Sequence, residues 1–225
     1  MIHTYKSASG KTTISVTHRN SDKVVYIILP SPLLESELED IANEKGCSIA
    51  VLSGLDWNDD LTPWPASAIT VETGAFKGEA QAFNDYLTGD VIHRVENILG
   101  VHNPVRSLIG LSLSGLFAVW QWAQDDCFTN IASISGSFWY EGFVDWVKDT
   151  YTSQNPKSHK TGKAFFSIGS QEGKSGPKVF AGVREATQEV VEILRKANIH
   201  AELTVTQGSH HSPLLPRLRQ ALAAV

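Results

Sequence analysis

Residues 105–124 read Val-Arg-Ser-Leu-Ile-Gly-Leu-Ser-Leu-Ser-Gly-Leu-Phe-Ala-Val-Trp-Gln-Trp-Ala-Gln, and this stretch decides the fold. An apolar run over 105–111 meets a mostly apolar helical run over 116–123, with small residues around Ser112 between them. This pattern is typical of a nucleophile elbow, a sharp strand-to-helix turn that exposes a serine hydroxyl above a sheet. The motif usually ends in glycine, and here Ser114 stands in that position. We therefore predict Ser112 as a nucleophile.

Composition describes an ordinary globular protein. A chain of 225 residues with 42% hydrophobic and 19% charged residues suits a single domain over residues 1–225. The net charge of -5 gives no electrostatic footprint for nucleic acid. No apolar run approaches the roughly 20 residues that span a bilayer. Cys47 and Cys127 make neither a disulfide framework nor a metal-ligand pattern.

These properties also give expectations about location and partners. Residues 1–6 lack the apolar core of a signal peptide, so we expect a cytoplasmic protein. We expect a small-molecule partner and no nucleic acid or membrane partner, and a homodimer is compatible with the sequence.

Strand and helix signals alternate along the chain. Apolar or alternating segments predict strands over residues 12–18, 24–29, 48–52, 105–111, 130–135, 163–168 and 201–206. Helical periodicity predicts helices over residues 35–45, 79–99, 116–123, 143–148, 178–196 and 214–224. The alternation predicts an α/β fold, with a mostly parallel central sheet flanked by helices on both faces and little or no lid.

Two loops complete this outline. Residues 53–79 contain three glycines and two prolines, and a loop of this length in a compact domain is often functional. Residues 152–162 are polar and are expected to form an exposed loop.

An acid and a histidine follow later predicted strands. Glu172 comes after the 163–168 strand and His210 after the 201–206 strand. The carboxyl ends of parallel strands meet at one edge of a sheet, so both side chains are expected near Ser112. A serine nucleophile needs a histidine base oriented by a carboxylate, and serine, acid and histidine is their order in α/β hydrolases. We predict these three residues as catalytic.

Other assignments stay open at this point. Asp145 and Asp149 are alternative acids, and His211 competes with its neighbour His210 as the base. Ser112 itself could be only a small residue at a tight strand–helix junction.

Acyl transfer also needs an oxyanion hole formed by two N–H donors. The residue after the nucleophile, Leu113, supplies the first. The second is expected from the loop after the 24–29 strand, where Pro30 and Pro32 have no N–H to donate. The remaining candidates are Ser31, Leu33 and Leu34, of which we select Leu33.

With these residues in place, the chain from about Val24 onward resembles the esterase D and enterochelin-esterase-like branch of the α/β-hydrolase superfamily. Four segments carry the resemblance: Asp-Asp-Leu-Thr-Pro-Trp at 59–64, Ser-Gly-Ser-Phe-Trp at 135–139, Gly-Ser-Gln-Glu at 169–172 and Gly-Ser-His at 208–210. It implies a cofactor-free serine esterase acting on carboxylic, thio- or siderophore esters, with Ser112 as nucleophile, His210 as base and Glu172 as acid. Leu-Pro-Ser-Pro at 29–32 departs from the family's usual Leu-Asp-Gly-like oxyanion segment.

The predicted function is hydrolysis of a small carboxylic ester through an acyl-enzyme, without metal or cofactor. Aromatic residues near the predicted site are expected to line the substrate pocket: Trp57, Trp64, Phe138 and Trp139. The alternative substrates are a thioester, an acetylated sugar or a siderophore lactone. A non-catalytic binding protein on the same fold is a further alternative.

Two weaker hypotheses concern charged side chains. His93 and Glu96 share a helix face, but no second histidine stands at the spacing of a zinc-binding helix, so we expect solvated surface residues. Arg106 or Lys163 could recognise an acidic substrate, although either suits a solvated strand flank.

Overall fold

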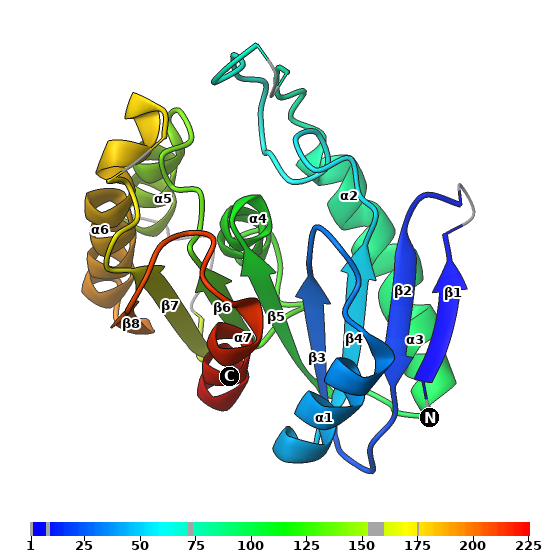
Figure 1. Cartoon of the computed structure of the whole chain (residues 1–225). Coiled ribbons are helices and arrows are strands. Elements are labelled where there is room, and N and C mark those ends of the chain that lie inside the picture. The colour runs from blue at the N-terminus through cyan, green and yellow to red at the C-terminus, as the bar shows by residue number, and fades with distance from the viewer. Residues whose placement is uncertain (1, 8–9, 72–73, 153–159, 175) are drawn as a thin grey trace.

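The computed structural model describes residues 2–7, 10–71, 74–152, 160–174 and 176–225. Its centre is an 8-stranded sheet with the order β1-β2-β4-β3-β5-β6-β7-β8 (Figure 1). The strands are β1 (Ile2–Lys6), β2 (Thr13–Thr17), β3 (Lys23–Ile28), β4 (Ser48–Ser53), β5 (Val105–Leu111), β6 (Asn130–Ile134), β7 (Lys163–Gly169) and β8 (His200–Thr206).

The sheet is mostly parallel, as predicted. All pairings from β4 through β3, β5, β6 and β7 to β8 are parallel, whereas β1–β2 and β2–β4 are antiparallel. Strand β1 was not predicted from the sequence. This edge strand buries none of its five residues, so it lacks the apolar alternation that marks a half-buried strand.

Helices cover both faces of the sheet (Figure 1). One face carries α1 (Glu35–Lys45) and α7 (Leu214–Ala224). The other face carries α2 (Ala80–Tyr86), α3 (Ile92–Leu99), α4 (Leu113–Trp122), α5 (Phe143–Thr152) and α6 (Val183–Lys196). These layers confirm the predicted α/β-hydrolase architecture.

The central strands have side chains buried on both faces. In β3, Val24, Tyr26 and Ile28 pack under one helical layer, while Val25 and Ile27 pack under the other. This division follows from the two-residue period of a strand. It explains why the strand is a continuous apolar run in the sequence.

Two predicted helices are less regular than expected. The predicted 79–99 helix is interrupted by a π-helical segment, Leu87–Val91. It contains Gly89, a residue that weakens regular helix. The predicted 178–196 helix begins with a 3-10 segment, Lys178–Gly182, before α6. The prediction of an exposed loop over 152–162 falls largely on 153–159, which lie outside the described residues.

An ion pair between Glu96 and Arg106 joins α3 to β5. Glu96 on α3 accepts hydrogen bonds from Arg106 of β5 at 2.5 and 2.8 Å and one from Tyr26 at 3.3 Å. The expectation of a solvated Glu96 was therefore wrong, because this carboxylate joins a helix to the sheet. The guanidinium of Arg106, which was a candidate for recognising an acidic substrate, is paired with Glu96.

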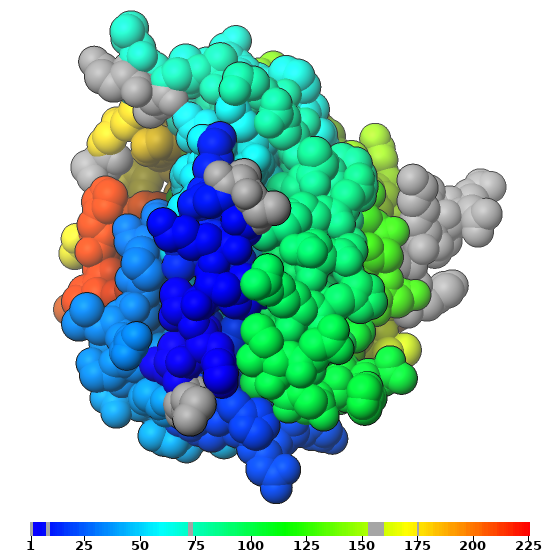
Figure 2. Space-filling view, turned by 90° about the vertical axis from the view of Figure 1, so that its right-hand side faces the viewer, coloured from blue at the N-terminus to red at the C-terminus, as the bar shows by residue number. Residues whose placement is uncertain are grey.

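The long loop between β4 and α2 projects beyond the carboxyl edge of the sheet (Figures 1 and 2). Trp64 anchors it: its indole N–H donates to the Glu141 carbonyl at 2.9 Å, and its own carbonyl accepts a hydrogen bond from Tyr140. An antiparallel bridge between Ala66 and Phe76 closes the projecting part at its base. The loop is therefore tied to the segment that follows β6.

None of the helices in the described ranges combines the length and the apolar character that crossing a membrane requires.

Candidate active site

Ser112 occupies the turn between β5 and α4. Its backbone has φ 60° and ψ −121°, a conformation that L-residues other than glycine rarely adopt. The Ser112 N–H donates to the Ile134 carbonyl at 3.0 Å, and the Ser112 carbonyl accepts N–H bonds from Leu116 and Ser137 at 3.1 Å. Bonds to β6, to α4 and to the segment after β6 thus hold the strained turn in place.

Small residues allow β5 and α4 to approach each other closely on either side of the Ser112 turn. A side chain at Gly110 would overlap the backbone of Ser114. Ser114, which replaces the motif's usual glycine, is fully buried, and its Oγ accepts the Leu111 N–H at 2.7 Å. The same Oγ lies 2.8 Å from the carbonyl oxygens of Leu111 and Ile28. Serine at this position therefore adds hydrogen bonding within the elbow and one contact to the end of β3.

Glu172 lies in the turn after β7, beside the turn that follows β8. Its N–H donates to the Gly169 carbonyl at 3.1 Å, and the Gln171 N–H donates to the Gly208 carbonyl at 2.8 Å. The Ser170 N–H donates to the Thr206 carbonyl at 2.7 Å. These backbone bonds fix the two turns side by side, as expected for neighbouring parallel strands.

The Glu172 carboxylate is 8% exposed and has a partner on each oxygen. Oε1 accepts the Gly169 N–H at 2.7 Å and the Ser135 hydroxyl, and Oε2 lies 3.2 Å from Nδ1 of His210. Burial would raise the pKa of this carboxyl, but hydrogen bonds from His210, Ser135 and Gly169 outweigh that effect and hold the pKa below its ordinary value. Glu172 is therefore an ionised acceptor next to a histidine.

His210 lies in the turn after β8, with its side chain 38% exposed. The glycine before the turn, Gly208, has φ 112°, and Ser212 caps the turn by accepting the Ser209 N–H at 2.9 Å. The neighbouring His211 is exposed and meets His210 edge-on, with ring centroids 5.5 Å apart. Of the two histidines, His210 is the one whose Nδ1 lies within hydrogen-bond distance of the Glu172 carboxylate.

Ser112, Glu172 and His210 line one cavity of about 400 Å³. Asp145 and Asp149, the alternative acids, are exposed on α5 and do not line it. The remaining residues around the cavity are Ser135, Trp139, Gln171, Gly173, Gly176, Pro177, Phe180, Val183, Ser209 and His211. The structure thus brings the three predicted residues to one concave surface at the carboxyl edge of the sheet.

Leu113 is the first residue of α4, so its N–H has no intrahelical acceptor and lies at the positive end of the helix dipole. Among the candidates for a second donor, the Leu34 N–H is already bonded to the Glu37 carboxylate at 3.0 Å. Leu33 lies between β3 and α1, with its side chain packed against the layer formed by α1 and α7.

The four aromatic residues predicted for the substrate pocket lie in different places. Trp139 lines the cavity with Ser112. Phe138 is 1% exposed and stacks on Phe143 within the core. Trp64 anchors the long loop, and Trp57 borders a separate surface hollow beside Asn58 and Asp59. These last three do not line this cavity, because their rings are used in packing or lie elsewhere along the loop.

A buried arginine beside the site was not predicted from the sequence. Arg217 of α7 is 5% exposed; Nη1 donates to the His210 carbonyl at 3.2 Å. Nη2 donates to the Ser135 hydroxyl and lies 3.4 Å from Glu172 Oε1. A signal existed, because Arg217 falls on the helical period of the apolar residues Leu214 and Leu218.

A second missed residue faces the serine itself. The Oγ atoms of Ser137 and Ser112 are 3.2 Å apart. Ser137 is 1% exposed and belongs to the Ser-Gly-Ser segment after β6. Its place at the carboxyl edge of the strand next to β5 is the signal that could have identified it.

The elbow and the α/β-hydrolase fold define the class as serine esterase-type hydrolases, and comparison with known families agrees. The chain belongs to the esterase family described as "Putative esterase", whose model matches residues 33–222.

Individual relatives are more distant. The chain is 28% identical over 201 residues to YbbA of Bacillus subtilis. The aligned region covers 83% of this chain and 78% of that protein. An IroE-like serine hydrolase of Shewanella oneidensis aligns with a TM-score of 0.78 at 15% identity, over 99% of this chain and 78% of its own. The siderophore hydrolase EstA of Aspergillus nidulans aligns with a TM-score of 0.75 at 17% identity, over 99% and 92% of the two chains. At these identities the solved structures support the fold.

Proposed function

We propose that the protein hydrolyses small carboxylic esters with a Ser112–His210–Glu172 triad. The observation that carries the proposal is the strained Ser112 turn, which opens into the same cavity as a histidine held by a buried carboxylate. Backbone strain persists where the surrounding structure fixes it, and it is common at catalytic residues.

In the first half of the reaction, Ser112 Oγ attacks the ester carbonyl carbon while its proton passes to Nε2 of His210. The tetrahedral intermediate then expels the alcohol, which takes the proton from His210, and an acyl-enzyme remains. In the second half, His210 removes a proton from water, and the hydroxide attacks the acyl carbon. Collapse releases the carboxylic acid and returns the proton to Ser112.

The groups around the triad support these steps. The Leu113 N–H is our first oxyanion donor, and Leu33 remains our proposed second donor. Glu172 keeps His210 oriented through Nδ1, which leaves Nε2 as the acceptor for the serine proton. Because the pKa of Glu172 is lowered, this carboxylate remains charged at neutral pH.

Arg217 acts in this proposal as a positioning residue. It links the His210 backbone, the Ser135 hydroxyl and Glu172 Oε1 through one guanidinium. Arginine suits this place because its planar fork presents several donors in fixed directions. Burial lowers the pKa of Arg217, and the adjacent Glu172 charge opposes that shift.

We expect Arg217→Met to lower kcat for ester hydrolysis by between about tenfold and a hundredfold, because Glu172 and His210 lose their common anchor. Removing the cation 3.4 Å from Glu172 Oε1 raises the pKa of that carboxyl. The acidic limb of the kcat/KM profile should therefore move to higher pH. Arg217→Lys keeps the charge and should leave that limb in place. An unshifted profile for Arg217→Met, measured on folded protein, would mean that Arg217 serves only stability.

The main rival is a non-catalytic binding protein on the same fold. A binding protein has no need of a strained serine or of a buried carboxylate beside a histidine, and both are present here. Siderophore esters remain a second substrate class, in view of the fold shared with the siderophore hydrolase EstA.

Stopped-flow hydrolysis of p-nitrophenyl acetate and butyrate tests the proposal. It predicts steady turnover, with an initial burst of p-nitrophenol approaching one equivalent of enzyme if deacylation is the slower half. Release no faster than in buffer alone would reject it.

A further inference from the structure

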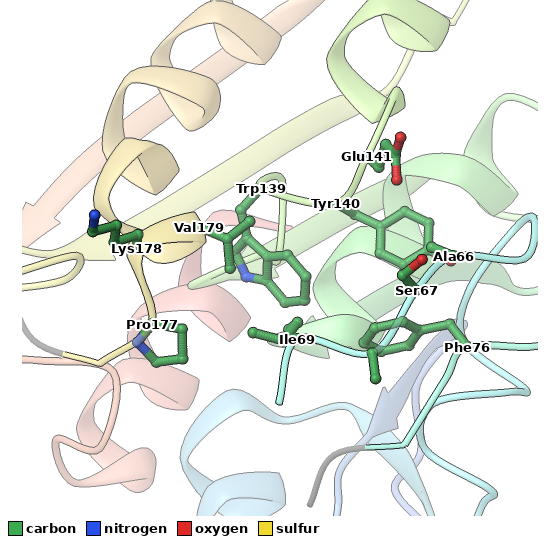
Figure 3. Close-up of a pocket in the computed structure, with 11 residues that line it drawn as sticks. Ala66, Ser67, Ile69, Phe76, Trp139, Tyr140, Glu141, Pro177, Lys178 and Val179 are labelled. Carbon is green, nitrogen blue, oxygen red and sulfur yellow. The ribbon is translucent and has the colours of Figure 1, made fainter. Parts of the chain in front are cut away.

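A second cavity of about 370 Å³ adjoins the one that contains Ser112. Trp139 and Pro177 line both cavities, so the two share a wall. Figure 3 shows Trp139 beside Ile69, with Phe76 and Val179 nearby. The remaining residues that line the second cavity are Ala66, Ser67, Ala68, Tyr140, Glu141 and Lys178.

A row of aromatic rings runs from one cavity into the other. Phe180, which lines the cavity of Ser112, has its ring centroid 5.0 Å from that of Trp139. Trp139 is 6.2 Å from Phe76, and Phe76 is 5.4 Å from Tyr140. These last three rings belong to the second cavity. The row of ring contacts connects the lining of one cavity with the lining of the other.

Several contacts fix the outer wall in place. Ala66 and Phe76 exchange two backbone hydrogen bonds at 3.1 and 3.0 Å. Trp64, just before this bridge, bonds to the backbone of Glu141 and accepts from Tyr140. The second cavity is therefore bounded by two segments that are hydrogen-bonded to each other, which is typical of a preformed ligand site.

The lining chemistry selects an apolar ligand. Glu141 and Lys178, the charged residues of the lining, are exposed to solvent, and Lys178 points away from the rings in Figure 3. Among the other lining residues, aliphatic and aromatic side chains predominate, and Val179 leaves 43% of its surface exposed. A ligand with an apolar chain would cover this surface.

We propose that the second cavity is a substrate subsite that binds an extended apolar chain on one side of the scissile ester. This inference rests on the proposed function, because it places the ester carbonyl at Ser112 and lets the chain follow the rings past Trp139. A substrate with only short groups would leave the second cavity empty and gain nothing from it. The protein would then prefer esters with a long alkyl chain over short ones.

Two isomeric esters test the subsite and show which side of the bond it serves. Ethyl octanoate carries its chain on the acyl side and octyl acetate on the alcohol side, and ethyl acetate is the short reference. We expect kcat/KM for one of the two isomers to exceed that for ethyl acetate by at least about tenfold, since each buried CH₂ favours binding. Flat values across the three esters would overturn the proposal.

Ile69→Asp places a charge in the subsite, and Val71→Asp is its matched control. Val71 is 95% exposed and does not line the cavity. Ile69→Asp should reduce the long-chain preference to within about threefold of unity, and Val71→Asp should preserve it. A preference that survives Ile69→Asp would also overturn the proposal.

A binding experiment separates failure of the subsite from failure of catalysis. Ser112→Ala protein is titrated with octyl acetate and ethyl octanoate, and tryptophan fluorescence reports binding. The subsite predicts that one isomer binds at least about tenfold more tightly than ethyl acetate, and that Ile69→Asp removes this difference. Selective binding without turnover by the unmodified protein would reject the proposed function and retain the subsite. Equal binding of all three esters would reject the subsite.

Discussion

Ser112→Ala should lower kcat/KM for p-nitrophenyl butyrate by at least about 10⁴-fold, because it removes the atom that forms the acyl-enzyme. The matched control is Ser137→Ala. Ser137 supplies the hydroxyl 3.2 Å from Ser112 Oγ, yet its backbone N–H bond to the Ser112 carbonyl does not depend on its side chain. Ser137→Ala should retain activity within about tenfold. Equal losses in both variants would contradict the assignment of Ser112 as nucleophile.

Substitutions at Ser112 should also show how much the strained backbone of this turn lowers the free energy of unfolding. At φ 60° and ψ −121°, Ser112→Gly relieves backbone strain that Ser112→Ala retains. Relief of about 1–3 kcal/mol is partly offset by the larger entropy of glycine in the unfolded chain. We expect the free energy of unfolding of Ser112→Gly to exceed that of Ser112→Ala by about 1 kcal/mol in urea denaturation. A less stable glycine variant would show that the turn is not strained.

His210→Ala should also lower kcat/KM by about 10⁴-fold or more, because it removes the group that we propose accepts the Ser112 proton. The neighbouring histidine provides the comparison. His211 is exposed, and its ring contacts the ring of His210 in an edge-on arrangement. His211→Ala should cost less than about tenfold, since it removes that ring contact and leaves the Glu172–His210 pair intact.

The two histidine variants are decisive when measured together over pH. The pH dependence of the rate should be unchanged in His211→Ala, because the Glu172–His210 pair is still present. A large loss in His211→Ala combined with a small loss in His210→Ala would reverse the assignment.

Much of the fold was predictable because buried parallel strands leave strong signals. Val24 to Ile28 is continuously apolar since both faces of β3 are covered, and β5 next to it buries Leu108 on one face and Ile109 on the other. Edge elements leave weaker signals. Residues 2–6 form β1 with no buried side chain, so nothing in their hydrophobic pattern distinguishes them from an exposed segment.

The site was predictable to the extent that chain topology determines it. Glu172 and His210 follow neighbouring parallel strands, and the structure places His210 Nδ1 3.2 Å from Glu172 Oε2. Topology does not say which aromatic rings line a cavity. Phe138 and Trp139 are adjacent in sequence, yet the first is buried in the core and the second lies between two cavities.

The contacts of Arg217 could not be predicted from the sequence, for a different reason. Its helix follows the turn that contains His210, but the contact to Ser135 brings together residues 82 positions apart. A charged residue on an apolar helix face indicates a buried partner without identifying it. Only the packing of α7 against β6 and β7 reveals that the partner is the hydrogen-bond network of Glu172.

Covalent labelling tests the central claim most directly. The folded protein is treated with a fluorophosphonate, digested, and mapped by mass spectrometry. We expect one adduct per chain, on Ser112, with loss of ester hydrolysis in proportion to labelling. A folded protein that remains unlabelled, or that carries the adduct on another residue, would contradict it.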